Sequence, residues 1–322
     1  MNIIGDALDG LTPGRPLGAA GLSMFPLFAR HEVQPGYVSL DEGLARGTVR
    51  VSEISVQGRV RELLVTNDEP WPVLILDGEE LIGAKQDRIL NLTILVPAKS
   101  RLNVPVSCVE AGRWQHRSRN FSSAKRAYYA SGRAMKAYQV TESYRTAQRP
   151  DADQGAIWED IALKSQRFSA YSPTSAMDIM YERNAVALER FERDLAPQPL
   201  QRGGIFVLGG DMLGMDVFDC PATWRKLLPK LAASYGLDAL DLADNVDALH
   251  RTREHRFDPK ALLSRVKALR QEHYPAVGLG EDVRLSGPDM HGGALVVGDS
   301  LLHLAAFSRV DRAGNGRLSD VA

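Results

Sequence analysis

Residues 73–96 read VLILDGEELIGAKQDRILNLTILV, a stretch that combines two apolar runs with a dense polar segment. The apolar runs have the composition of buried β-strands. Asp77-Gly78 is a strong turn signal, so we expect a β-hairpin between residues 73–76 and 80–82. Polar side chains carried between two core strands sit on a rigid support. The stretch therefore predicts a β-rich core together with a functional site.

Around this stretch the chain is a succession of short strand patterns. Residues 22–112 contain apolar and alternating segments, interrupted by a brief helix at 40–46 that Ser39 can cap. They predict an N-terminal, mainly antiparallel β unit. The expected strands are 22–29, 49–55, 59–65, 88–96 and 102–109.

Beyond this unit the composition changes twice. Residues 122–197 carry helix signals, and residues 203–307 mix strand and helix patterns and return a hairpin around Gly298-Asp299-Ser300. The expected elements are helices at 122–147, around Trp158–Phe168, from Pro173, at 222–235 and at 259–272, and a strand at 204–208.

These patterns predict an α+β fold built as a single domain over residues 22–310. An irregular Gly- and Pro-rich segment, residues 1–21, is expected before the domain, and a loose tail, residues 311–322, after it.

The bulk composition excludes several classes of protein. Lys and Arg number 39 against 40 Asp and Glu, a formal net charge of −1, so overall charge indicates neither a nucleic-acid nor a membrane partner. Cys108 and Cys220 are the two cysteines, too few for a disulfide scaffold. No signal-peptide pattern opens the sequence, and no apolar run reaches the roughly 18 residues of a membrane span. We expect a cytoplasmic protein.

Three acidic or thiol groups are candidate catalytic residues. Neighbours on a strand point to opposite faces, so Glu79 and Glu80 cannot act as a catalytic pair. Glu79 or Glu110 could orient a hydroxyl or act as a base, and the alternative for the Glu79-Glu80 pair is a solvated turn. Cys108 precedes Arg113 closely and could be a nucleophile, although a small core residue is the more usual role of a cysteine in an apolar strand.

Cationic and aromatic residues near the central stretch indicate an anion site. Lys85, Gln86 and Arg88 follow a Gly-Ala bend, and Arg113 and Trp114 follow the strand at 102–109. Lys and Arg bind phosphate or carboxylate groups, and a Trp can stack on a base or sugar. The alternative is a surface rim held by local ion pairs. No metal-binding, P-loop or Rossmann motif is present in the sequence.

Asp211 is a weaker candidate for a ligand-binding residue, and it comes from an internal sequence similarity. Residues 205–219, IFVLGGDMLGMDVFD, resemble residues 73–87 when one gap is allowed. If the two units are equivalent, Asp211 lies in the same cleft as Lys85 and belongs to the ligand site.

The segment between residues 113 and 149 is strongly basic. It holds nine Lys or Arg against one acid, Glu142, with four tyrosines interleaved. The helix at 122–147 could therefore dock an acidic protein or, less favoured, a nucleic acid. The alternative is a solvated helix face that answers acids elsewhere in the fold.

The segments DGEELIGAKQDRILN (77–91), VPVSCVEAGRW (104–114) and LLHLAAF (301–307) resemble those of a bacterial family of unassigned activity. It is the ARG-and-rhodanese-phosphatase-superfamily-associated protein family, where ARG means ADP-ribosylglycohydrolase. The resemblance covers about residues 20–307 and implies a role near NAD or ADP-ribose metabolism. It brings no established catalytic residues.

Two hypotheses about function follow. The sequence does not decide whether the protein is an enzyme, and it does not identify a cofactor. The first is binding or processing of a nucleotide-like or phosphorylated small molecule. The second is a non-catalytic scaffold that binds partners through the basic, Tyr-rich helix.

Overall fold

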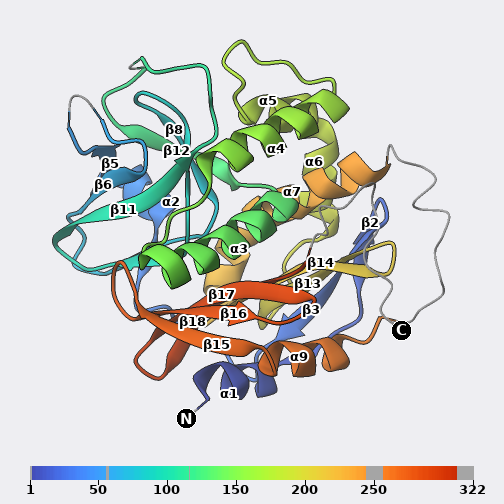
Figure 1. The fold of residues 1–322 in the computed structure, drawn as a ribbon. Helices are drawn as coiled ribbons and strands as arrows, with labels where there is room; N and C mark the ends of the chain where they lie inside the picture. Colours follow the sequence, from blue (N-terminus) through green and yellow to red (C-terminus); the bar gives the residue numbers. More distant parts are fainter. Residues whose placement is uncertain (1, 56–57, 116, 244–256, 310–322) are drawn as a thin grey trace.

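The computed structural model describes residues 2–55, 58–115, 117–243 and 257–309, and it has an α+β fold (Figure 1). Three layers are visible: a small β-barrel, a group of helices, and a broad antiparallel sheet. None of the helices in these residues is long and apolar enough to cross a membrane.

The barrel is built from residues 49–127. It closes in the order β11-β6-β5-β12-β8-β9, and every pairing is antiparallel. Its strands are β5 (Val49–Glu53), β6 (Glu62–Asn67), β8 (Glu79–Gly83), β9 (Arg88–Leu90), β11 (Ser100–Cys108) and β12 (Phe121–Ala127).

A three-stranded sheet adjoins the barrel. In it β7 (Val73–Ile75) pairs with β10 (Ile94–Val96) and, in parallel, with β4 (Val38–Ser39). The helix α2 (Leu40–Ala45) follows β4, and Ser39 and Glu42 form a capping box at its start. The helix expected here and its capping residue are confirmed.

The broad sheet contains strands from both the N-terminal and the C-terminal parts of the chain. Its order is β1-β3-β13-β14-β18-β17-β16-β15, with β2 beside β3. Hairpins at Gly209-Gly210 and at Gly298-Asp299 connect successive strands, and the second is the terminal hairpin expected from the sequence. The strands are β1 (Thr12–Pro13), β2 (Leu17–Ala19), β3 (Leu22–Phe28), β13 (Gln201–Leu208), β14 (Asp211–Phe218), β15 (Arg270–Pro275), β16 (Glu281–Ser286), β17 (Met290–Val297) and β18 (Ser300–Ser308).

Helices cover both faces of this sheet. Figure 1 shows α3 and α7 between the sheet and the barrel, and α1 and α9 beneath the sheet. Two apolar clusters fill these interfaces, one on each face. The helices are α1 (Ile3–Asp9), α3 (Ala130–Ala147), α4 (Gln154–Arg167), α5 (Asp178–Arg183), α6 (Ala185–Asp194), α7 (Pro221–Ala243) and α9 (Pro259–Lys267).

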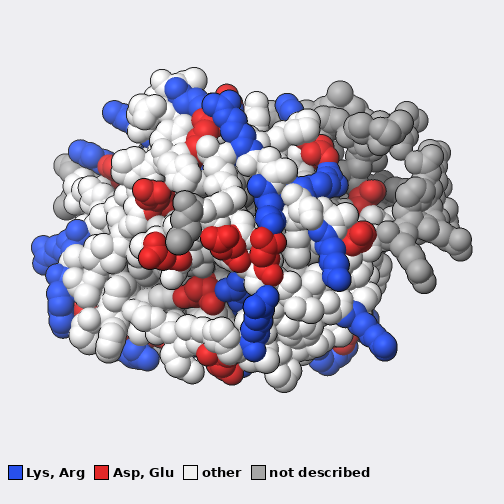
Figure 2. Space-filling model, turned by 90° about the horizontal axis from the view of Figure 1, so that it is seen from below, with Lys and Arg blue, Asp and Glu red and all other residues white. Residues whose placement is uncertain are grey.

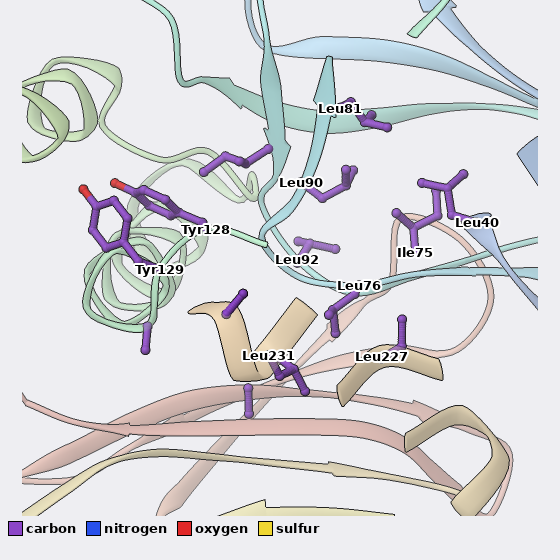
Figure 3. Close-up of a cluster of buried hydrophobic side chains, with 14 of the residues drawn as sticks. Leu40, Ile75, Leu76, Leu81, Leu90, Leu92, Tyr128, Tyr129, Leu227 and Leu231 are labelled. Carbon is purple, nitrogen blue, oxygen red and sulfur yellow. The ribbon is translucent and has the colours of Figure 1, made fainter. Parts of the chain in front are cut away.

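The barrel rests on α7 through apolar side chains. Leu76 points toward Leu227 and Leu231 of α7 in Figure 3, and all three residues are buried. Leu92 belongs to the same apolar cluster, which packs the barrel side of the molecule against the helix.

The hairpin expected at Asp77-Gly78 is wrong. The chain does turn there, with Gly78 at φ +77, but β7 and β8 do not pair. The Gly78 N–H bonds to the Leu90 carbonyl, and the turn passes the chain from the small sheet into the barrel. The single strand expected at 88–96 is likewise two strands, β9 and β10, separated by Asn91–Thr93.

The helix expected from residue 122 begins eight residues later. Residues 121–127 are β12, which pairs with β8 and β5, because the barrel needs this strand to close. Close to the observed helix start, the Ser131 N–H donates a hydrogen bond to the Asp238 carboxylate at 2.6 Å. A local Ala-rich pattern was thus overridden by tertiary pairing.

Smaller corrections concern element ends. Residues 3–9 of the segment expected to be irregular form α1, capped by the Asn2 side chain. The helix expected at Pro173 starts at Asp178, and the helix expected at 259–272 ends at Lys267, where β15 soon follows. The tail expected at 311–322 lies outside the described residues.

Candidate functional site

Three loops meet at one end of the barrel, which we call the barrel mouth. The register places the end of β5 beside the start of β6, the end of β8 beside the starts of β9 and β12, and the end of β11 beside the start of β9. The β8–β9 loop (84–87) and the segment after β11 are tied together by a bond from the Val109 N–H to the Asp87 carbonyl, 3.0 Å. Residues 84–88 of the polar stretch recognised in the sequence thus lie at this mouth.

Arg113 holds the loops of the mouth together. Its Nε lies 2.9 Å from Glu110 Oε1, and its Nη2 reaches Glu110 Oε2 at 2.7 Å and Asp87 Oδ1 at 3.1 Å. Its Nη1 donates to the Ala84 carbonyl at 2.7 Å. Burial alone would raise the pKa of Glu110, but its hydrogen bonds, first among them those from Arg113, together leave that pKa lowered. Arg113 and Glu110 are thus occupied with each other and with the loop.

Gln86 links this clamp to Arg88. Its amide nitrogen donates to the Glu110 carbonyl at 2.9 Å, and its amide oxygen accepts from Arg88 Nη1 at 3.0 Å. The side chain is buried and acts as a bridge. Of the predicted ligand residues, Gln86 and Arg113 therefore support the mouth.

Arg88, Lys85 and Trp114 form a separate group. The Lys85 ammonium lies 4.9 Å from the centre of the Trp114 ring, and the Arg88 guanidinium carbon 5.7 Å from it. Arg88 is fully buried, whereas Trp114 is 43% exposed. The indole is the solvent-facing member of a cationic cluster.

The fourth member of this group is Glu53, which no sequence pattern indicated. Opposed residues of antiparallel strands share a face, so Arg88 and Cys108, which are register partners, point the same way as the buried Leu81. By the same reasoning Glu53 follows Val51 on the inner face of β5. Only the closure of the barrel brings β5 next to this group.

Glu53 and Arg88 leave polar atoms unsatisfied. Glu53 Oε1 lies 3.9 Å from Arg88 Nη2, beyond hydrogen-bond distance. Arg88 Nε and Nη2 and both Glu53 oxygens are buried without a hydrogen-bond partner. These are four of the twelve such side-chain atoms in the described residues. Native interiors keep such atoms rare, so their concentration makes this group the candidate site.

Cys108 backs this cluster but is a poor nucleophile. It is fully buried, and its Sγ lies 3.8 Å from the Val60 carbonyl oxygen. Burial raises the pKa of the thiol to about 11, against the opposing effect of Arg88. The thiol therefore stays protonated at neutral pH.

Glu79 and Asp211 lie elsewhere. Glu79 begins β8 at the end of the barrel away from the mouth, where it pairs with Lys230 of α7 and accepts from the Leu76 N–H at 3.0 Å. Asp211 is exposed at the β13–β14 turn of the broad sheet. β13 and β14 form a hairpin while β7 and β8 do not, so the sequence similarity between 73–87 and 205–219 is not a structural repeat.

Much of the basic segment is internal. Arg133 and Lys136 are fully buried, as are Tyr128 and Tyr129. Arg133 donates to the Asp216 carboxylate through Nη1 at 3.1 Å and Nη2 at 2.6 Å, while Lys136 pairs with Asp77. These two cations form ion pairs with buried acids of the same chain, so they are not available to a binding partner. Figure 2 shows that the face seen from below also mixes both signs of charge.

Comparison with known proteins adds one match. The family model described as the ARG and Rhodanese-Phosphatase-superfamily-associated Protein domain matches residues 10–307. The chain belongs to this family. No curated protein and no solved structure matches it. In this member of the family, residues 83–88 of the first segment and residues 108–114 of the second lie together at the barrel mouth.

Proposed function

We propose that the protein binds a nucleotide-like or phosphorylated small molecule at the barrel mouth. The observation that carries the proposal is the buried Arg88 guanidinium, which keeps two nitrogens without a hydrogen-bond partner beside an exposed indole. An unsatisfied buried donor costs roughly 1–3 kcal/mol, and a ligand acceptor would remove that cost.

The neighbouring residues suit such a ligand. Trp114 offers an aromatic face on which a base or sugar can stack. Lys85 and Arg88 carry positive charge next to that face and would balance a phosphate. The word ARG in the family description makes ADP-ribose and NAD sensible first ligands.

Thermal unfolding with ADP-ribose, NAD and AMP tests the proposal. A ligand at about 100 times its Kd stabilises the native state by about 2.7 kcal/mol, which raises Tm by several degrees. The shift should disappear in Trp114→Ala and persist in Trp71→Ala, because Trp71 is also exposed but lies outside the mouth. No shift with any of the three ligands at millimolar concentration would refute the proposal.

A further inference from the structure

We infer that Glu53 and Arg88 together read the polar edge of a nucleobase, with Glu53 as the specificity-determining residue. The inference rests on the proposed function, since it assigns the ligand class that the same site accepts. It starts from the unsatisfied atoms: two donor nitrogens of Arg88 and two acceptor oxygens of Glu53.

Donors and acceptors lie side by side here. The Glu53 side chain is 5% exposed and the Arg88 side chain 0%, so neither can turn outward to water. A partner that satisfies both must present an acceptor toward Arg88 and a donor next to it toward Glu53. The pair at 3.9 Å is too long to satisfy itself.

This requirement excludes a site for phosphate alone. Phosphate and pyrophosphate offer acceptor oxygens and negative charge, which the Glu53 carboxylate repels. A nucleobase edge, in contrast, presents a ring nitrogen or carbonyl acceptor next to an N–H donor, as in adenine or uracil.

The surroundings agree with a flat ligand. The Trp114 indole packs against both cations of the cluster and is partly exposed, so it offers a flat apolar surface beside the atoms that would meet the base. The side chain of Lys85 also passes close to Glu53, because a Cβ built on Gly58 would meet Lys85 Cδ at 3.3 Å and Glu53 Oε2 at 3.1 Å.

Titration calorimetry with two matched pairs of ligands tests whether the site recognises the polar edge of the base. AMP is compared with purine riboside 5′-monophosphate, which lacks the exocyclic amine, and UMP with its N3-methyl derivative, whose donor is blocked. We expect one parent nucleotide at least to bind and its donor-free analogue to bind about tenfold to a hundredfold more weakly. Ribose 5-phosphate, which has no base, should bind more weakly still.

Glu53→Gln supplies the second measurement. The substitution should lower the affinity for the parent nucleotide by a similar factor and leave the affinity for the donor-free analogue nearly unchanged. The difference in affinity between the two ligands should therefore shrink. Glu62→Gln, on the neighbouring strand, is the matched control, because Glu62 is paired with the exposed Arg59.

The outcomes separate this inference from the proposed function. Equal binding within both pairs, or binding of ribose 5-phosphate as tight as that of AMP and UMP, would overturn the base-reading role and leave an anion site. Absence of binding by every nucleotide, ADP-ribose and NAD included, would overturn both. If Glu53→Gln fails to fold, the ligand pairs measured on the unaltered protein decide the question.

Discussion

Glu79 and Glu80, adjacent in β8, reach opposite sides of the barrel wall. Glu79 pairs with Lys230 of α7, whereas Glu80 Oε2 accepts from Arg126 Nε of β12 at 2.6 Å. Both side chains are buried. The alternation of a strand thus gives two neighbouring carboxylates separate structural roles, and each role can be tested.

Lys230→Met should lower the free energy of unfolding by about 3 kcal/mol, because it leaves the buried Glu79 carboxylate without its cation. Asp41, 2.8 Å from Lys230, loses the same partner. Urea unfolding measures the change, with Lys226→Met as the control, because Lys226, on the same helix, forms an exposed ion pair with Glu42. A variant as stable as the control would show that the Glu79–Lys230 pair does not anchor the helix.

Glu80 should make stability depend on pH. Burial, only partly opposed by Arg126, raises the pKa of Glu80 from 4.5 to about 7. The folded state therefore binds more protons than the unfolded state between these values, and this contribution to stability falls as pH rises through that window. Glu80→Gln lacks the titration, so its stability relative to the unaltered protein should improve from pH 5 to pH 8, by an amount on the order of 3 kcal/mol.

The comparison of the two proteins at each pH cancels the titrations that they share. Unfolding in urea at pH 5, 6.5 and 8 gives the difference directly. A difference that stays constant with pH, or that turns against the Gln variant at pH 8, would mean that Arg126 keeps the carboxylate charged throughout.

The sequence predicted those parts of the fold that local signals control. The helix cap at Ser39 and the terminal hairpin at Gly298 each depend on a few neighbouring residues, and both are confirmed. The turn at Gly78 was also recognised, but its partner strands were not, since pairing depends on segments far along the chain. Residues 121–127 show the same limit, because barrel closure selects a strand there.

The candidate site also contains residues that the sequence indicated and a residue that only the structure reveals. Lys85, Arg88 and Trp114 stood out as charged or aromatic residues near strand ends, and the structure brings them together. Glu53 carries no motif and lies over 30 positions before Lys85, so only tertiary register reveals it. Sequence alone could not distinguish Arg88, which has free donors, from Arg113, whose donors are occupied.

Cys108 should resist thiol reagents in the folded protein. With a pKa of about 11, only about one thiol in ten thousand is ionised at pH 7, and the side chain is buried. In a Cys220→Ala background, labelling by a chromogenic disulfide should be slow at pH 7.5 and become fast in denaturing urea. Rapid labelling of the folded protein at pH 7.5 would restore Cys108 as a candidate nucleophile.

Arg113→Lys should destabilise the protein although it preserves the charge. The guanidinium serves Glu110, Asp87 and the Ala84 carbonyl at once, and a lysine ammonium cannot reproduce this planar fork. We expect a loss of about 2–4 kcal/mol in urea unfolding, because buried acceptors lose their partner. Arg117→Lys is the matched control, since Arg117 is exposed in the same segment. If Arg113→Lys unfolded at the same urea concentration as this control but failed to bind AMP or ADP-ribose, Arg113 would be a ligand residue and not the clamp of the barrel mouth.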